Sequence, residues 1–262
     1  KLLRLLLVPF ALLCVLSVRL AWPRWRVRFG TLWMGRLGHL AGNTEVYLCE
    51  RSQGQHAGFI DLWIADGEPA CRQIYVMLKR RLRVGGGFLR LVALCNKLFP
   101  GQERHAVPEG DIDRDPQNLL ERYPAHLAFT REEHSRGWSG LRALGIAPGA
   151  PFVCLIVRDA AYLPELAYHS FRDSDIDSYS DACTALVRRG YYVIRMGAKV
   201  AKAMRFSGGR IIDYATKGHD DFMDAYLGAS CSFCVSNGCG FDAIPVIFRR
   251  PVCYVNYVPL EY

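Results

Sequence analysis

The stretch from residue 231 to 257, CSFCVSNGCGFDAIPVIFRRPVCYVNY, constrains the fold more than any other part of this sequence. Residues 231–236 are a short apolar run typical of a buried strand, and residues 237–240 form a turn that contains two glycines. Residues 241–248 suit a short helix, and residues 252–256 predict a second buried strand. This order predicts a βαβ unit whose glycine turn and helix N-terminus face a phosphate. An ordinary βαβ turn without a ligand fits the local pattern equally well.

The residues before this unit continue the same alternation of strands and helices. Expected strands cover 152–157, 191–195 and 211–213, and expected helices cover 175–189 and 219–227. We expect Asp175 to be the N-cap of its helix and Gly190 to end that helix. The series predicts a parallel sheet covered by helices.

Polar and glycine residues follow these strands at the carboxyl edge, where open α/β sheets bind ligands. They are Arg158, Asp159, Arg195, Gly197, Asp213, Tyr214, Ser236, Asn237, Gly238, Gly240 and Asp242. We expect Arg158 and Arg195 to hold a diphosphate through paired N–H bonds, and Asp213 to accept from a sugar hydroxyl. Each residue taken singly also fits an ion pair at the sheet edge.

The first half of the chain places a second group of candidates between an expected strand, 25–29, and an expected helix, 37–49. The group consists of Gly35, Arg36, Gly38, His39 and Asn43. Its position is typical of an anion or substrate site. His39 suits a general base because the pKa of imidazole is near neutrality, and a structural histidine that hydrogen-bonds the loop is the alternative.

The rest of the first half predicts one further strand and three helices before a domain boundary. The strand is 59–64, and the helices are 70–82, 88–99 and 131–144 with Thr130 as N-cap. Residues 100–123 read as a loop, and the sequence GIAPGAP at 145–151 indicates the boundary. We therefore expect a hydrophobic segment at 1–22 and two domains at 23–148 and 149–262.

Residues 1–22 are mostly Leu, Val and Ala, with Arg4 and Arg19 near the two ends. The uncharged run, 5–18, is shorter than the roughly 20 residues of a membrane span. We expect this segment to form a helix that attaches to the membrane surface at the cytoplasmic face of the inner membrane. A helix packed on its own domain and the end of a longer transmembrane helix are the alternatives. We expect both ends of the chain to be trimmed from a longer protein.

The formal net charge of +8 favours anionic partners, which are a nucleotide diphosphate, an acidic lipid surface or nucleic acid. No nucleic-acid-binding motif is present, so we expect no nucleic-acid partner. Ten cysteines are scattered through apolar runs, which favours a reducing compartment. Cys231 and Cys234 have the spacing of half a zinc site, but no second half completes it, so we expect no metal.

Several stretches resemble a family of bacterial glycosyltransferases encoded among surface-polysaccharide genes. They are RLGHLAGNTEVYL at 36–48, VRDAAYL at 157–163, HSFRDSDIDSYSDA at 169–182, GYYVIRMG at 190–197, IIDYA at 211–215, DFMDAYL at 221–227 and SNGCGFDAIPVIFRRPVCYVNYVP at 236–259. The resemblance runs in order from Arg28 to the end of the chain. The turn at 236–240 departs from the serine-rich form of the family, and the carboxyl end of the family pattern is missing.

The resemblance implies a GT-B-like fold of two Rossmann-like domains with parallel sheets. It implies a nucleotide-sugar donor in the second domain and a glycan or lipid-linked acceptor in the first, with Arg158 matching a donor-binding arginine of related fucosyltransferase-like enzymes. It also implies that arginines, rather than a metal or another cofactor, neutralise the diphosphate. On this basis His39, Asp159 and Arg158 are the expected catalytic residues. A non-catalytic glycan-binding or scaffold protein of the membrane and another sugar-nucleotide enzyme, an epimerase or hydrolase, are the alternatives.

Overall fold

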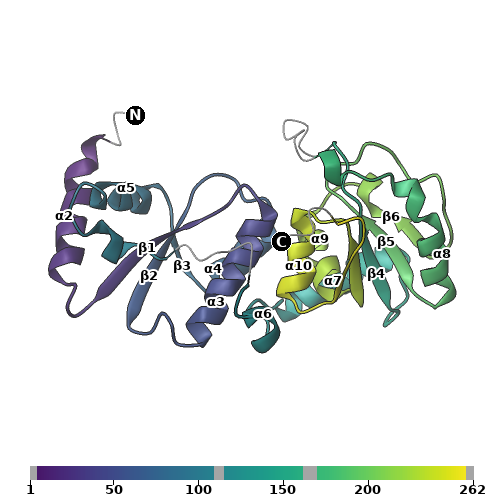
Figure 1. The fold of residues 1–262 in the computed structure, drawn as a ribbon, viewed down its shortest axis with the longest axis horizontal. Helices are drawn as coiled ribbons and strands as arrows, with labels where there is room; N and C mark the ends of the chain where they lie inside the picture. Colours follow the sequence, from purple (N-terminus) through teal and green to yellow (C-terminus); the bar gives the residue numbers. More distant parts are fainter. Residues whose placement is uncertain (1–4, 109–114, 162–169, 258–262) are drawn as a thin grey trace.

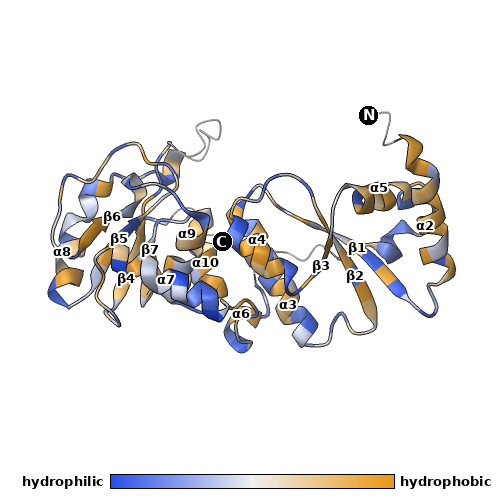
Figure 2. Cartoon of the chain, turned by 180° about the vertical axis from the view of Figure 1, so that it is seen from behind, coloured by the Kyte–Doolittle hydropathy of each residue, from blue (hydrophilic) through white to orange (hydrophobic). Residues whose placement is uncertain are grey.

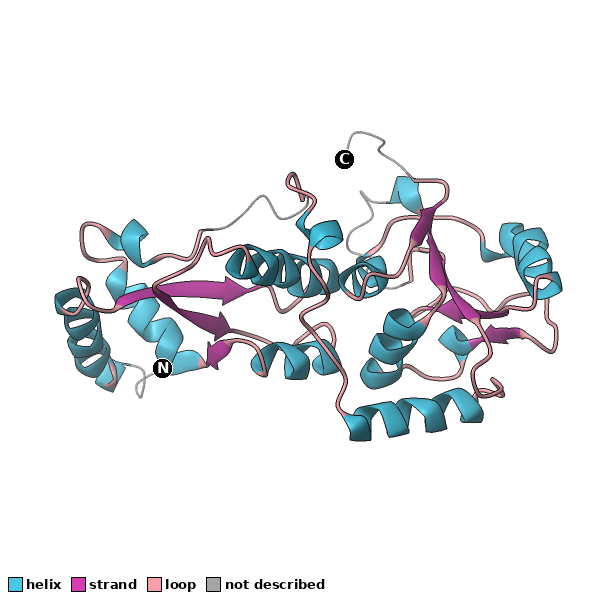
Figure 3. Cartoon of the chain, turned by 90° about the horizontal axis from the view of Figure 1, so that it is seen from below, coloured by secondary structure: helices cyan, strands magenta, loops and turns pink. Residues whose placement is uncertain are grey.

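The computed structural model describes residues 5–108, 115–161 and 170–257, which form two α/β domains that lie side by side (Figure 1). Residues 1–4 of the segment predicted to attach to the membrane, Arg4 among them, lie outside these residues. Each domain has one parallel sheet with helices packed against it (Figure 3). The prediction of an α/β fold with parallel sheets is confirmed.

The N-terminal sheet has the order β1-β2-β3. Its strands are β1 Arg26–Leu32, β2 Phe59–Ala65 and β3 Arg83–Gly85. Side chains alternate along a strand, so one face of this sheet packs on α2 and α5 and the other on α3 and α4. These helices are α2 Val8–Leu20, α3 Thr44–Ser52, α4 Arg72–Lys79 and α5 Gly87–Asn96. The sequence pattern missed β3, because three residues carry no alternation of their own.

The C-terminal sheet has the order β6-β5-β4-β7-β8, with every neighbouring pair parallel. Its strands are β4 Phe152–Ile156, β5 Tyr192–Met196, β6 Ile211–Asp213, β7 Phe233–Ser236 and β8 Val252–Tyr254. The longest helices of this half are α7 Arg131–Ala143, α8 Ser180–Arg188 and α9 Asp221–Ser230. The central strand β4 is buried at every residue, as predicted. The prediction of a buried strand at 252–256 is wrong, since β8 is a partly exposed edge strand.

Several expected helices are shorter or less regular than the pattern predicted. The helix expected at 241–248 consists of a single 3-10 turn, Gly240–Asp242, and α10, Ala243–Ile247. The helix expected at 37–49 begins as a π-helix, His39–Asn43, before α3. The loop expected at 100–123 contains a 3-10 helix, Gln102–His105, and α6, Leu119–Arg122. The helix expected at 175–189 begins as the 3-10 helix Ile176–Tyr179, and Asp175 caps it as predicted.

Helix α7 packs against α9 of the C-terminal half, although the sequence places it before the boundary at 148, and that boundary stays a prediction. Gly137 and Gly140 lie against Tyr226 and Met223 of α9, and a Cβ at either glycine would overlap its neighbour. The predicted cap of α7 is confirmed, because the Thr130 hydroxyl accepts a hydrogen bond from the Glu133 N–H at 3.2 Å. The sequence could not show this packing, because the contacts join segments more than eighty residues apart.

The two domains share an apolar core. Ala225 of α9 and Ile247 of α10 belong to the same buried cluster as Leu40 and Ile74 of the N-terminal domain. Polar bonds flank this cluster, and one of them joins the Arg72 N–H to the Asp221 carboxylate at 2.7 Å. Because the cluster is buried from both sides, separating the domains would expose its side chains to water.

Helix α2 packs against α5 through Ala11 and Val15, which are fully buried. This contact fits the alternative of a helix packed on its own domain, although much of the opposite side of α2 is exposed. Within the described ranges, no helix is sufficiently long and apolar to span a bilayer.

His219, which lies two residues before α9, contacts two carboxylates of that helix. Its Nε2 lies 2.7 Å from an Asp221 oxygen and its Nδ1 lies 2.8 Å from an Asp224 oxygen. The hydrogen bond to Asp224 is the main cause that raises the pKa of His219 to about 9. The folded pKa exceeds the unfolded value of about 6.5, so this stabilisation is complete below about pH 6.5 and disappears as the pH rises through about 9.

We therefore expect His219→Asn to flatten the pH dependence of the urea midpoint between about pH 6 and pH 9.5. The wild type should lose stability across this range, and the variant should lose less. Equal slopes for the two proteins would show that His219 has no part in the titration. His134→Asn on the exposed side of α7 is a matched control.

Candidate functional site

The carboxyl ends of β4 and β7 meet at one buried asparagine, Asn237. Its side-chain oxygen accepts from the Arg158 N–H at 2.9 Å, and its side-chain nitrogen donates to the Arg172 carbonyl at 2.7 Å. Asn237 is completely buried. It therefore holds together the end of β4, the end of β7 and the segment that contains Arg172. The Arg158 backbone thus meets the 237–240 turn, and the role of both in binding a donor stays a prediction.

Two guanidinium groups lie close together at this edge, on Arg158 and Arg172. Burial, followed by the positive charge of Arg172, holds the pKa of Arg158 below its usual value. Arg158 forms an ion pair with Asp173. The Arg172 Nε is buried and has no hydrogen-bond partner among the described residues. Two neighbouring cations, one with an unused buried donor, form an arrangement that an anion would stabilise.

Sequence reasoning missed Arg172 as a site residue. It lies in the HSFRDSD motif of the loop that follows β4, but its position depends on a contact with Asn237, 65 residues away. A rule that inspects every cation in the loop after the first strand of the second domain would have found it.

The glycine turn at 237–240 is built for close approach of other groups. Gly238 has φ +86°, and the Tyr257 ring lies where a Cβ of residue 238 would be. The Ser236 hydroxyl donates to the Asp242 carboxylate and accepts from the Gly238 N–H, each at 3.0 Å. Burial is the main cause that raises the pKa of Asp242.

Two N–H groups of this turn are not available for the phosphate site that the sequence predicted at a helix N-terminus. The Cys239 N–H donates to Asp242 at 3.0 Å and the Gly238 N–H is also bonded, so both are used within the turn. Helix α10 behind the turn has only five residues, too few for a substantial dipole. The candidate anion site therefore rests on Arg158 and Arg172, while Ser236, Gly238 and Asp242 shape the turn beside them.

The predicted loops of the two domains touch each other through their glycines. A Cβ at Gly240 would lie 3.3 Å from the Gly38 nitrogen, and a Cβ at Gly38 would lie 3.7 Å from the Gly240 Cα. The π-helix that starts at His39 packs against α10 just behind this contact. The predicted acceptor loop and the predicted glycine turn therefore lie next to each other, where the π-helix His39–Asn43 meets Gly240. Turns of π-helix are frequent at functional sites.

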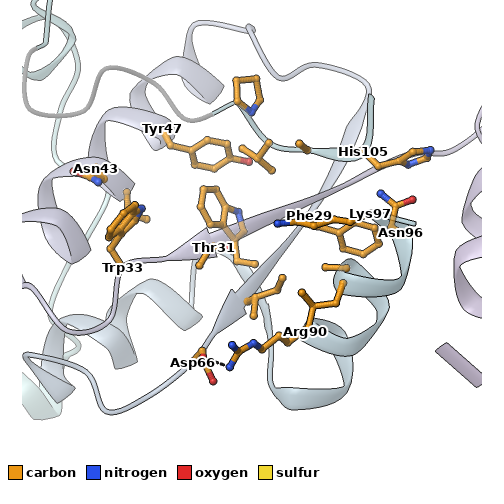
Figure 4. A pocket seen from close by; sticks show the side chains of 18 of the residues that line it. Phe29, Thr31, Trp33, Asn43, Tyr47, Asp66, Arg90, Asn96, Lys97 and His105 are labelled. Atoms are coloured by element: carbon orange, nitrogen blue, oxygen red, sulfur yellow. Dashed lines mark hydrogen bonds and ion pairs between the residues drawn. The ribbon is translucent and has the colours of Figure 1, made fainter. Parts of the chain in front are cut away.

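A cavity of about 570 Å³ extends from His39 into the N-terminal domain (Figure 4). Its lining includes His39, Asn43 and Trp33 from the predicted acceptor side. The rings of Trp33 and His39 are 5.6 Å apart, and the His39 Nδ1 is 3.4 Å from the Asn43 amide nitrogen. The cavity thus combines an aromatic wall with an imidazole that can receive a proton.

The far end of this cavity is bounded by α5 and by Asp66 just after β2. Figure 4 shows Arg90 of α5 and Lys97, the residue after α5, at this end, with the Arg90–Asp66 ion pair across it. Arg158 and Arg172 do not line this cavity. Of the remaining acceptor-side residues, Gly35 and Arg36 are exposed just before the π-helix.

Arg195 and Asp213 do not join Arg158, contrary to the prediction. Arg195 is 1% exposed, and its Nη1 donates to the Lys202 carbonyl at 2.8 Å and lies 3.3 Å from an Asp213 oxygen. Arg195 and Asp213 are direct partners in the β5–β6 register, so their ion pair links two neighbouring strands of the sheet. The prediction failed because a charged residue near a strand end looks the same in sequence whether its side chain faces a ligand or the interior.

Three other predicted site residues, Gly197, Tyr214 and Asp159, lie after strands β5, β6 and β4 and interact with neighbouring parts of the protein. Gly197 lies beyond β5 at φ +150°, and the buried Tyr214 hydroxyl accepts from the Asp220 N–H at 3.3 Å. Asp159 accepts from the Ala161 and Ala201 N–H groups at 2.9 Å, one on each carboxylate oxygen. Asp159 therefore links two loops beside Arg158, and its role as a base stays a prediction.

One group of possible metal ligands occurs within the described part of the chain. A side-chain atom from each of Glu45, Cys49 and His126 lies within 4.8 Å of the others. The Arg249 guanidinium contacts the Glu45 carboxylate at 2.7 Å and the Cys49 sulfur at 3.6 Å, so a cation already faces this group. All ten cysteines, which lie within the described ranges, are free thiols. The expectation that no metal is bound stays a prediction.

Comparison with known proteins finds similarity in structure. No protein-family profile matches the chain, and no curated protein matches it. The chain is similar to the ADP-heptose lipopolysaccharide heptosyltransferase II of E. coli, with 15% identity, a TM-score of 0.52 and coverage of 89% of this chain and 87% of that one. It is also similar to a family 9 glycosyl transferase from Veillonella parvula DSM 2008, with 12% identity, a TM-score of 0.55 and coverage of 87% and 80%. The chain therefore shares the two-domain, GT-B-like fold of these two proteins.

Proposed function

We propose that this protein is a glycosyltransferase that moves a sugar from a nucleotide-diphosphate donor to a hydroxyl of a glycan or lipid-linked acceptor of the cell surface. The observation that carries the proposal is the pair of guanidinium groups, Arg158 and Arg172, at the carboxyl edge of the second sheet beside the Gly238 turn. The shared fold supports it, since one similar structure is a transferase named for the sugar nucleotide ADP-heptose.

The residues divide the reaction between the two domains. The acceptor oxygen forms a bond to the anomeric carbon of the sugar, and the bond between that carbon and the diphosphate breaks. The electron pair of the broken bond leaves with the diphosphate, where Arg158 and Arg172 stabilise the added negative charge. The acceptor proton passes to His39, which lines the cavity that would receive the acceptor. Two arginines supply the positive charge, so we expect transfer to persist in the presence of EDTA.

A melting-temperature screen against nucleoside diphosphates and their sugar derivatives tests donor binding. A ligand that binds only the folded state stabilises it by about 2.7 kcal/mol at a concentration one hundred times its Kd. Labelled donor then separates the candidate activities by product. A glycosylated acceptor supports transfer, free sugar indicates a hydrolase and a new sugar nucleotide indicates an epimerase. Absence of binding to any nucleotide would favour a glycan-binding or scaffold protein.

His39→Gln should lower kcat by about 10²–10⁴-fold, because general-base catalysis contributes about that much. Donor affinity should stay within twofold, since His39 is in the other domain from the two arginines. Turnover and donor Kd measured on the same preparation check both parts. His134→Gln, an exposed imidazole on α7, is the control. An unchanged kcat for His39→Gln would assign His39 to loop structure.

A further inference from the structure

The N-terminal domain presents an apolar surface to its surroundings on α2 and α5. Large apolar side chains at the outer side of α2 and just before it are 46–84% exposed, namely Leu5, Leu6, Phe10, Leu13, Leu16 and Leu20. Leu94 of α5 and Leu98 just beyond it are 50% and 75% exposed. We call these eight residues the outer apolar face. Figure 2 shows the two helices side by side at the end of the molecule that is farthest from the second domain.

Helix α2 is apolar on both sides, which is unusual for a helix on a water-facing surface. Ala11 and Val15 fill the contact with α5, while Phe10 and Leu13 point away from it. Arg19 fixes the end of the helix, because it donates to the Asn96 side chain at 2.9 Å and to the Pro100 carbonyl at 2.8 Å. The outer apolar face is therefore held in place on the domain rather than carried by a loose segment.

Positive charge is concentrated in the segments that carry this face. Residues 5–26 and 87–98, which include α2 and α5, contain five cations, Arg19, Arg24, Arg26, Arg90 and Lys97, and no Asp or Glu. Arg24, Arg26 and Lys97, which lie just beyond the ends of α2 and α5, are exposed. Trp25 between the two arginines is 61% exposed. Tryptophan and basic residues at the margin of an apolar face are typical of a protein surface that meets lipid headgroups.

We propose that the outer apolar face docks on an anionic lipid bilayer. The apolar side chains of α2 and α5 would enter the headgroup boundary, and Arg24, Arg26 and Lys97 would contact anionic headgroups. A second copy of the chain fits less well. A two-fold dimer brings the same patch of both subunits together, so it would place these cations against their own copies.

Docking through α5 brings the lipid surface next to the cavity that starts at His39. Arg90 and Leu94 of α5 line the cavity together with Lys97 just after the helix, and Leu94 also belongs to the outer apolar face. An acceptor anchored by a lipid chain would thus reach the cavity from the docked side. This consequence rests on the proposed transfer, whereas the docking itself does not.

Flotation with vesicles tests the docking without donor or acceptor. The full chain is mixed with vesicles of phosphatidylcholine alone or of phosphatidylcholine and phosphatidylglycerol in equal parts. We expect binding to the anionic vesicles that weakens with added salt, and little binding to the neutral ones. Phe10→Gln with Leu13→Gln should weaken binding roughly tenfold or more, because two apolar side chains lose their burial in lipid. Arg24→Gln or Lys97→Gln should each weaken it roughly fivefold.

Matched controls come from the second domain. Trp138→Gln removes an exposed aromatic side chain from α7, and Arg188→Gln removes an exposed cation from α8. Neither should alter vesicle binding, and all variants should keep the wild-type melting temperature because the replaced side chains are exposed. The proposal is overturned if the wild type binds neither kind of vesicle or binds both equally. It is also overturned if the control variants lose as much vesicle binding as the variants of the outer apolar face. The outer apolar face would be assigned to a second copy of the chain if the wild type formed a dimer without binding vesicles, and if Phe10→Gln with Leu13→Gln dissociated that dimer.

Discussion

Arg158→Gln should lower the transfer rate by about 10²–10³-fold, the usual effect of removing one preorganised group that stabilises charge in the transition state. Glutamine keeps a polar N–H donor, but it is shorter than arginine and lacks the positive charge that meets the leaving diphosphate. Arg172→Gln should have an effect of the same order, because the Arg172 Nε is a buried donor that finds no partner among the described residues. Steady-state kinetics with the donor identified by the melting-temperature screen measure both variants.

Arg195→Gln is an informative comparison for these two variants. Its guanidinium is buried against Asp213 and the Lys202 carbonyl, so the variant should lower the melting temperature and leave donor affinity unchanged in the protein that remains folded. Arg188→Gln on the exposed side of α8 should alter neither property. If Arg158→Gln transferred sugar at the wild-type rate, the diphosphate could not lie between Arg158 and Arg172.

The largest stability loss should follow from Arg249→Met. Glu45 is fully buried, and the Arg249 guanidinium contacts its carboxylate at 2.7 Å. Removing one partner of a buried ion pair costs about 3–5 kcal/mol, because the other charge stays buried without compensation. Arg249 also donates to the Tyr123 carbonyl at 2.9 Å, so the same residue ties the connection between the domains to α10. Urea unfolding of the variant and the wild type gives the difference directly.

A second substitution separates charge from packing at this pair. Adding Glu45→Gln to Arg249→Met should recover part of the loss, since glutamine carries no charge and its oxygen can still accept from the His126 N–H. Arg205→Met is the matched control, because its ion pair with Asp177 involves an Arg205 side chain that is 82% exposed and contributes at most about 1 kcal/mol. A loss for Arg249→Met no larger than that of the control would contradict a structural role for the pair.

Local sequence signals predicted the sheets well where strands are long and apolar. The continuous apolar run at β4 and the alternation of strands and helices after it predict the parallel sheet of the second domain. Thr130 marks the start of α7. The failures come from contacts between distant segments. Gly137 and Gly140 place α7 against α9 only through Tyr226 and Met223.

The site shows the same division between local and distant information. Arg158 could be predicted because it directly follows a buried strand, and His39 because it follows a glycine at the start of a helix. Arg172 could not, since Asn237 positions it from another strand. Arg195 was assigned to the ligand because the sequence does not distinguish a buried side chain from one at the rim.

The backbone contact between Gly38 and Gly240 has a mechanical consequence. A Cβ at Gly240 would lie 3.3 Å from the Gly38 nitrogen, so a side chain there would push the two backbones apart by a few tenths of an ångström, whereas a Cβ at Gly38 would make an ordinary contact at 3.7 Å. Many two-domain proteins open and close about a hinge to admit ligands. In this protein the apolar core that the two domains share opposes such a hinge motion. Changes in substrate preference would therefore have to arise from side chains around the site rather than from a different extent of domain closure.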